Sequence, residues 1–230
     1  MRVLSVITFL AALVLPFGYG SASPPIDISA KDLQTLQTQA AQGNANAQYS
    51  LGLMYGAGLG APQDYTKARQ WLEKAAAQGH AEAQHALGLL YVEGKKGVPQ
   101  DYAKARQFFE QAAAQGDADA QYELGVMYHR GEGVPQDYTK ARQWFEKAAA
   151  QGSARAQFNL GVLYHNGLGV LQDYVRAYMW WSLAAARSTG NQQKSRAENR
   201  DKVAQHMTPE QIAEAQRLAQ QCQAQQFKGC

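Results

Sequence analysis

The stretch DADAQYELGVMYHRGEGVPQDYTKARQWFEKAAAQG, residues 117–152, decides the fold because close copies of it lie before and after it. Its closing segment, Ala-Ala-Ala-Gln-Gly at residues 148–152, also occurs at residues 75–79 and 112–116, with a looser copy at residues 39–43. The glycines that end these four segments are 36, 37 and 36 residues apart. A fixed period of this length is typical of repeat architectures. It defines four units, residues 44–79, 80–116, 117–152 and 153–190.

Each unit is expected to contain two helices joined by a tight turn. Along the first helix, small and large residues recur at spacings that place them on one helical stripe. In the first unit this stripe consists of Ala47, Leu51, Gly52 and Tyr55. Residues 58–62 then contain two glycines and a proline, which predicts the turn. Asp64 follows the turn and is placed to accept a backbone N–H as the N-cap of the second helix.

A glycine returns at the same position of every first helix. Glycine in a helix interior costs about 1 kcal/mol relative to alanine, so its recurrence needs a reason in the packing. We expect a neighbouring backbone or ring to press on this position, where a Cβ atom would be in the way. The four glycines are Gly52, Gly88, Gly125 and Gly161.

The whole motif reads AxAQxxLGxxY, then GxGVPQDYxKA, then WFxxAAxQG, with small variations between copies. It closely resembles the Sel-1-like repeat, a relative of the tetratricopeptide repeat, over residues 44–190. Tetratricopeptide repeats proper run 34 residues, so the 36-residue period with its Gly-Pro loop favours the Sel-1-like type. The resemblance implies an all-α fold, a right-handed α-solenoid of stacked hairpins that scaffolds protein complexes or binds peptides.

The repeats are flanked by segments that we expect to cap them. Residues 27–43 predict an N-terminal capping helix, in which Ser29 and Asp32 have the spacing of a capping box. Residues 191–230 predict two C-terminal capping helices, over about residues 191–206 and 209–225. The second of these opens with an N-cap threonine, a proline and a capping-box glutamine, which are Thr208, Pro209 and Gln211.

The C-terminal helices have a surface to cover. The second helix of the fourth unit is apolar on nearly all sides, and such a helix is buried in a folded protein. Positions that carry charges in the first unit become Tyr178, Ser182 and Leu183 in the fourth. We therefore expect the C-terminal helices to bury Tyr178, Trp181 and Leu183.

Residues 1–22 are expected to be a signal peptide. Arg2 supplies a positive end, residues 3–17 are almost wholly apolar, and residues 20–22 are the small residues that precede cleavage. The alternative is an uncleaved anchor, but the apolar run is shorter than the ~20 residues of a spanning helix. We expect cleavage after Ala22, no membrane insertion after cleavage, and a periplasmic or secreted mature protein.

The two cysteines, Cys222 and Cys230, leave two alternatives open. An oxidising compartment permits a disulfide between them. On one continuous helix they would lie about 12 Å apart, beyond the ~7 Å limit for a bridge, so a bridge requires the helix to end soon after Cys222. Two free thiols on a frayed tail are the other alternative.

Charge and motifs favour neither nucleic-acid binding nor catalysis. The 22 basic and 19 acidic residues are interspersed, so no basic stripe is expected to bind phosphates. The sequence contains no phosphate-binding glycine loop, no HExxH, no CxxC and no GxSxG motif. His129 and His165 occupy equivalent positions about one repeat apart, where a structural role is expected rather than a metal site. We predict a non-enzymatic protein without metal or cofactor.

The candidate site is a second stripe of residues on the first helices. The residues of this stripe differ from one repeat to the next, whereas those of the core stripe are nearly identical. In solenoids of this kind the first helices line the concave side, so we predict that this stripe binds protein or peptide partners. Ordinary solvated helix surface is the alternative for any single residue. An apolar track along the stripe consists of Leu53, Leu89, Val126 and Val162. The polar candidates are Asn46, Ser50, Glu82, Glu93, Asp119, Glu123, Arg130, Arg155, Asn159 and Asn166.

A second function class comes from the family resemblance alone. A cysteine-rich branch of the family is associated with penicillin binding and β-lactam hydrolysis, which implies a β-lactam or cell-wall-directed hydrolase as the alternative. In that branch cysteines staple each hairpin, whereas no repeat of this chain contains a cysteine. The predicted function is therefore an exported interaction scaffold.

Overall fold

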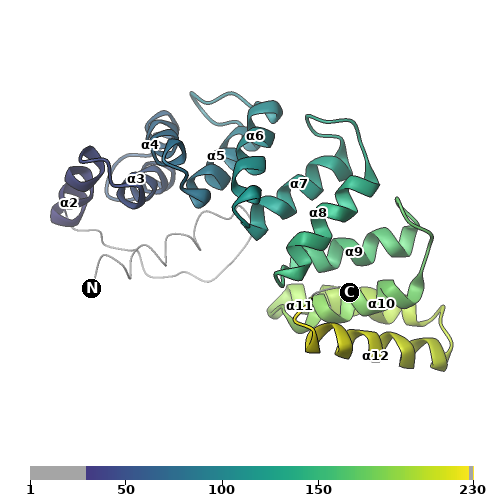
Figure 1. The fold of residues 1–230 in the computed structure, drawn as a ribbon. Coiled ribbons are helices and arrows are strands. Elements are labelled where there is room, and N and C mark those ends of the chain that lie inside the picture. The colour runs from purple at the N-terminus through teal and green to yellow at the C-terminus, as the bar shows by residue number, and fades with distance from the viewer. Residues whose placement is uncertain (1–29, 228–229) are drawn as a thin grey trace. The chain divides into compact units, whose positions relative to one another are not determined.

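The computed structural model describes residues 30–227 and Cys230, and within them the chain is all-α, as predicted (Figure 1). The chain divides into two compact units at Ala112 and Ala113, within one helix. Below, first and second unit mean these two parts, and the four copies of the motif are called repeats. The first unit contains α2 (Ala30–Ala41), α3 (Ala45–Ala57), α4 (Tyr65–Ala77), α5 (Ala81–Glu93) and most of α6 (Tyr102–Ala114). The second contains α7 (Ala118–Arg130), α8 (Tyr138–Ala150), α9 (Ala154–Asn166), α10 (Tyr174–Ala186), α11 (Gly190–Ala204) and α12 (Pro209–Ala224).

Each repeat folds into the predicted pair of helices because both ends of each helix are specified locally. Asp64 accepts the Lys67 N–H at 3.0 Å, which confirms it as the N-cap of α4. α3 ends at Gly58, whose left-handed φ of 71° few other residues adopt. In the loop that follows, the Gln63 side chain donates to the Gly56 carbonyl at 2.8 Å. The same loop bond recurs in the other three repeats, from Gln100, Gln136 and Gln172.

The recurring glycines lie where the two helices of a hairpin meet. A Cβ atom at Gly125 would lie 2.5 Å from the Phe145 ring, far inside contact distance. Gly88 faces Phe109 and Gly161 faces Trp181 in the same way. The expectation of a pressing group is confirmed, although at Gly52 that group is the Leu72 side chain at 2.6 Å.

Buried glutamines join successive repeats, a feature that the sequence analysis did not anticipate. Gln48 is 5% exposed, and its side chain donates to the Ala40 carbonyl at the end of α2 at 3.0 Å. It also accepts a bond from the Gln78 side chain at 2.8 Å. Because the last carbonyls of a helix have no partner within it, the glutamine supplies the donor they need. The equivalent residues, which also donate to a carbonyl eight residues before them, are Gln84, Gln121 and Gln157.

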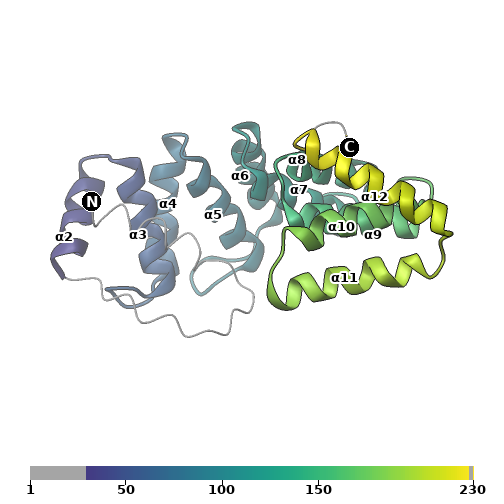
Figure 2. The same cartoon turned by 90° about the horizontal axis from the view of Figure 1, so that it is seen from below.

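α11 and α12 both pack against α10, as predicted (Figure 2). Four positions that are exposed or half-buried on α4, α6 and α8 are buried on α10, and they hold Tyr178, Met179, Trp180 and Leu183. The expectation for Trp181 was wrong. Its ring lies on Gly161 and its Nε1 donates to the Phe158 carbonyl at 3.1 Å, so Trp181 belongs to the core of its own hairpin.

The helix termini of both caps can be compared with the prediction. Thr208 accepts the Gln211 N–H, and the Gln211 side chain accepts the Thr208 N–H, which confirms the capping box of α12. At the other end, the predicted capping box of Ser29 and Asp32 and the predicted signal peptide lie outside the described residues. Among the described residues, no helix combines the length and apolarity needed to cross a membrane.

Of the two alternatives for the cysteines, the structure contains the disulfide. α12 ends at Ala224, and Gln226 and Phe227 then adopt positive φ angles of 52° and 65°, so the helix does not continue to the second cysteine. The Cα atoms of Cys222 and Cys230 come to lie 5.5 Å apart. The turn also places the Phe227 ring 4.2 Å from the Arg187 guanidinium.

Candidate functional site

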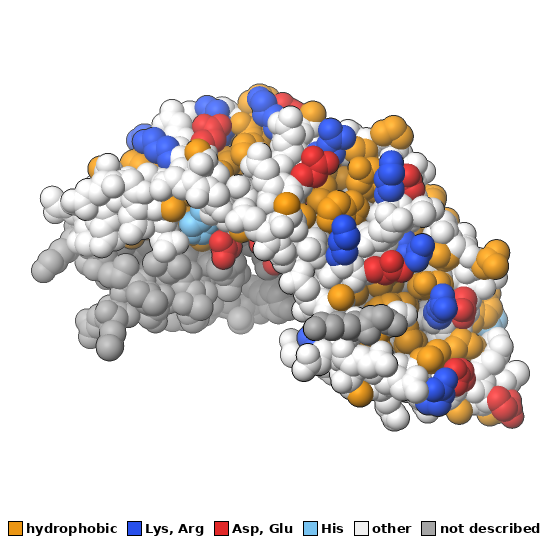
Figure 3. All heavy atoms as spheres, in the orientation of Figure 1, with side chains coloured by type: hydrophobic (Ala, Val, Ile, Leu, Met, Phe, Trp, Pro, Cys, Tyr) orange, Lys and Arg blue, Asp and Glu red, His pale blue; other side chains and the backbone are white. Residues whose placement is uncertain are grey.

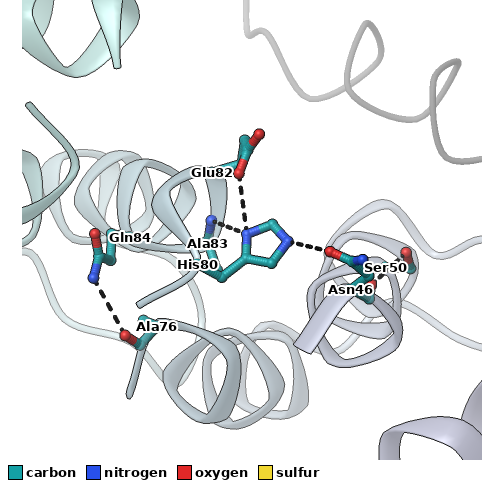
Figure 4. Close-up of polar contacts among 7 residues, drawn as sticks. All are labelled: Asn46, Ser50, Ala76, His80, Glu82, Ala83 and Gln84. Atoms are coloured by element: carbon teal, nitrogen blue, oxygen red, sulfur yellow. Dashed lines mark hydrogen bonds and ion pairs between the residues drawn. The ribbon is translucent and has the colours of Figure 1, made fainter. Parts of the chain in front are cut away.

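In the first unit, His80 connects the candidate residues Asn46 on α3 and Glu82 on α5 (Figure 4). Its Nε2 lies 3.0 Å from the Asn46 side-chain oxygen, and its Nδ1 accepts the Ala83 N–H at 3.3 Å as the N-cap of α5. The Glu82 carboxylate lies 3.2 Å from Nδ1 and is otherwise exposed. The polar surface of α3 is thus tied to the start of α5.

Ser50, a predicted partner-binding residue, does not lie on an open surface. Ser50 is 1% exposed, and its hydroxyl donates to the Asn46 carbonyl at 2.8 Å. Leu53, on the predicted apolar track, is also buried. The physical reason is that every residue of α3 from Ala47 to Met54 is buried, so this helix has no open stripe along its middle.

In the second unit, the candidate residues Glu123, Arg155 and Asn159 take part in contacts between α7 and α9 that involve Tyr122. The Arg155 guanidinium lies 2.9 Å from the Glu123 carboxylate and 4.0 Å from the Tyr122 ring, while Asn159 donates to the Tyr122 hydroxyl at 3.5 Å. Burial lowers the pKa of Arg155, but Glu123 and Tyr122 outweigh this effect and the pKa is raised overall. Arg155 therefore stays charged, and these residues form a polar seam between two repeats.

The other candidates are exposed, with short local contacts. Glu93 pairs with Lys95 at 2.7 Å, and Arg130 lies 3.5 Å from Glu132. Asn166, at the end of α9, donates to the Val162 carbonyl at 3.0 Å. The exposed candidates are Asn46, Glu82, Glu93, Asp119, Arg130 and Asn166.

Charges of both signs lie side by side elsewhere on the surface (Figure 3). On the second helices, Arg69 pairs with Glu73 at 2.9 Å and Arg142 pairs with Glu146 at 2.6 Å. Pairs of this kind leave little net field to attract a ligand of one charge.

The equivalent histidines pack within their own hairpins. His129 lies 5.4 Å from the Tyr138 ring, and His165 lies 5.5 Å from Tyr174 and 5.4 Å from Trp181. Burial, aided by the neighbouring Arg130 charge, lowers the pKa of His129. Among residues 30–227 and 230, no three histidine, cysteine or acidic side chains are grouped closely enough to hold a metal ion.

A pocket of about 420 Å³ lies in the first unit among α3, α4 and α5. Its walls include Leu53 of α3 and Leu89 and Glu93 of α5, all of which lie on the predicted stripe. In the first unit, part of the predicted stripe therefore lines a cavity instead of forming a flat helix surface.

The helices of each hairpin pack together at a glycine, and buried glutamines link each hairpin to the helix before it. Tandem hairpins of this kind define a helical-repeat protein of the solenoid class. The Sel1 repeat model matches residues 45–80, 81–117, 118–153 and 154–188, which together make up more than half of the sequence. The chain belongs to the Sel1 repeat family.

Two solved structures support this assignment. A Sel1 repeat protein from Oxalobacter formigenes is 35% identical, with a TM-score of 0.65 over 73% of this chain and 69% of that chain. A protective antigen present in uropathogenic Escherichia coli strains is 30% identical, with a TM-score of 0.53 over 86% of this chain and 50% of that chain. This chain thus spans only half of the Escherichia coli protein. The comparison with curated proteins gave no match.

Proposed function

We propose that this chain is an exported scaffold that binds partner proteins or peptides along the first helices of its repeats. The observation that carries the proposal is the contrast within these helices. Their packing positions hold the same residues in each copy, whereas their exposed positions differ, as in Asn46, Glu82 and Asp119. The Sel1 repeat fold generally mediates protein–protein interaction, which agrees with a surface that varies over a constant frame.

An alanine variant tests the proposed surface. We would replace Glu82, Glu93, Asp119 and Arg130, which are exposed, and leave Glu123 intact because it pairs with the half-buried Arg155 at 2.9 Å. Helicity and melting should change little, while capture of partners from the native envelope should fall and depend on salt. The matched control replaces exposed second-helix residues Gln70, Gln107 and Gln143. Loss of capture only in the control would refute the proposed surface.

Export rests on the predicted signal peptide and is supported by the disulfide, since such bonds persist in oxidising compartments. N-terminal sequencing of the protein recovered from the periplasm or medium tests it. We expect the mature chain to begin at Ser23. An intact Met1 on protein confined to the cytoplasm would overturn the proposal.

No arrangement among the described residues supports the alternative hydrolase. Purified protein tested with the chromogenic β-lactam nitrocefin, beside a known β-lactamase, should give no turnover above background. Turnover that saturates with substrate would overturn the non-enzymatic proposal.

A further inference from the structure

The pocket of the first unit exists because two positions of the repeat hold unusually small side chains there. On the first helix, Gly56 stands where the other repeats have Val92, His129 and His165. On the second helix, Leu72 stands where they have Phe109, Phe145 and Trp181. Both Gly56 and Leu72 line the pocket, so part of the cavity is volume that the larger side chains of the other repeats would occupy.

The fourth repeat shows what fills this volume. The His165 ring lies between Tyr174 and Trp181, with ring centroids 5.5 and 5.4 Å away. These separations fall in the range that aromatic pairs prefer, about 4.5–7 Å. The first repeat keeps the tyrosine, as Tyr65 in the pocket wall, but has neither the imidazole nor the indole.

The remaining walls suit an aromatic guest. Ala68, Leu72 and Leu90 line the pocket and are buried, and Glu93 and Lys95, which pair at 2.7 Å, also line it. The volume of about 420 Å³ falls within the range of about 300–1,000 Å³ that is typical of ligand pockets. An apolar cavity with a polar rim is also how interfaces receive an anchor side chain.

We infer that this pocket binds an aromatic side chain presented by a partner protein, which takes the place of the ring that the other repeats supply themselves. The inference rests on the proposed scaffold function and specifies its anchor. The pocket walls include Leu53, Leu89 and Glu93 of the predicted stripe, so a partner lying along α3 and α5 reaches the pocket directly.

The test fills the pocket with the side chains of the other repeats, in the variant Gly56→His with Leu72→Phe. A Cβ atom at Gly56 would lie 3.7 Å from the Ala68 Cβ, an ordinary contact, so the fold should accept the change. The probes are N-acetyl-tryptophanamide and N-acetyl-leucinamide, titrated into the full mature chain and followed by NMR at the methyl groups of Leu53 and Leu90, which line the pocket and are present in every variant. Gln143→Ala, at an exposed second-helix position of the second unit, is the control variant.

We expect saturable shifts from the tryptophan probe in the wild type and in the control. In the filled variant, affinity should fall at least tenfold, with equal or higher melting temperature. The leucine probe should bind several-fold more weakly. Equal binding of the tryptophan probe to the filled variant, or no binding to the wild type, would overturn the inference.

Capture of partners separates this inference from the scaffold proposal. If the filled variant captures the partner as well as the wild type does, the anchor is wrong while the scaffold stands. If the wild type captures no partner, the scaffold proposal itself fails. If sedimentation shows a wild-type dimer that the filled variant lacks, a second copy occupies the pocket and the partner assignment is overturned.

Discussion

At the scale of single residues, each repeat depends on one glycine of its first helix. Because this residue has no side chain, a large side chain of the second helix packs directly on the backbone of the first. A substitution that adds a side chain at Gly88 or Gly125 must displace the Phe109 or Phe145 ring from a fully buried position. The displaced ring has no free volume beside it, because protein interiors are close-packed. The glycine is thus a packing residue despite its cost to the helix.

We predict that Gly88→Leu or Gly125→Leu lowers the free energy of unfolding by several kcal/mol through overpacking. Thermal melting followed by circular dichroism measures the effect. Asn166→Leu, at an exposed helix end, is the matched control and should change the melting temperature little. If either glycine variant melts within a degree or two of the wild type, the packing assignment is wrong.

The buried glutamines give a second prediction at this scale. Gln48→Leu removes the donor to the Ala40 carbonyl and the acceptor for Gln78, so we expect a loss of about 1–3 kcal/mol. Gln157 makes the equivalent backbone bond at 3.5 Å, but its side-chain oxygen is buried without a partner. Gln157→Leu should therefore cost less than Gln48→Leu. Urea unfolding of the two variants that gives equal losses would contradict this account of the glutamines.

The glutamines also show what the sequence alone could not provide. A polar residue beside an apolar stripe is compatible with either solvent or a buried partner, and only the fold places a free carbonyl eight residues earlier within its reach. The disulfide is similar, because it depends on the backbone reversal at Gln226 and Phe227. Glycine packing and helix caps, in contrast, were predictable because local spacing determines them.

At the scale of elements, α10 differs from the other second helices because it has no following repeat and is covered by α11 and α12. Tyr178 also receives a bond from Gln216 of α12 at 3.5 Å. The need for a cover was predictable from the apolar composition of α10. The role of Trp181 was not predictable, because its ring packs inside its own hairpin. Trp180 beside it is the residue that becomes buried in this repeat, whereas its equivalents on α4, α6 and α8 are half-buried.

We predict that truncation after Gly190 exposes Tyr178, Met179, Trp180 and Leu183 and leaves an apolar patch that soluble monomers seldom expose. The truncated protein should aggregate or bind a hydrophobic dye, as measured by light scattering and by dye fluorescence. Replacing Tyr178 with Arg and Leu183 with Lys, the residues of α8 at these positions, should partly restore its solubility. A monodisperse truncation with unchanged melting would contradict the capping role.

At the scale of the whole molecule, the repeat number, the all-α fold and the family were accessible from the sequence, because one motif recurs four times. The candidate site was accessible only in part. Sequence variation predicts a binding stripe, but Ser50 in it is buried, and Glu123, Arg155 and Asn159 form contacts between helices. The pocket could have been found by aligning the repeats, where Gly56 and Leu72 are the smallest residues in their columns.

The central claim is that partners bind the first helices, and site-specific photo-crosslinking tests it most directly. A photoreactive residue would be placed at Glu82, Glu93, Arg130 or Asn166 of the first helices, and at Gln70, Gln107 or Gln143 of the second helices. All seven positions are exposed, so each variant should fold and be exported equally. Covalent adducts with a partner protein from the first-helix positions alone are the result we predict. Adducts from the second-helix positions alone would contradict the claim.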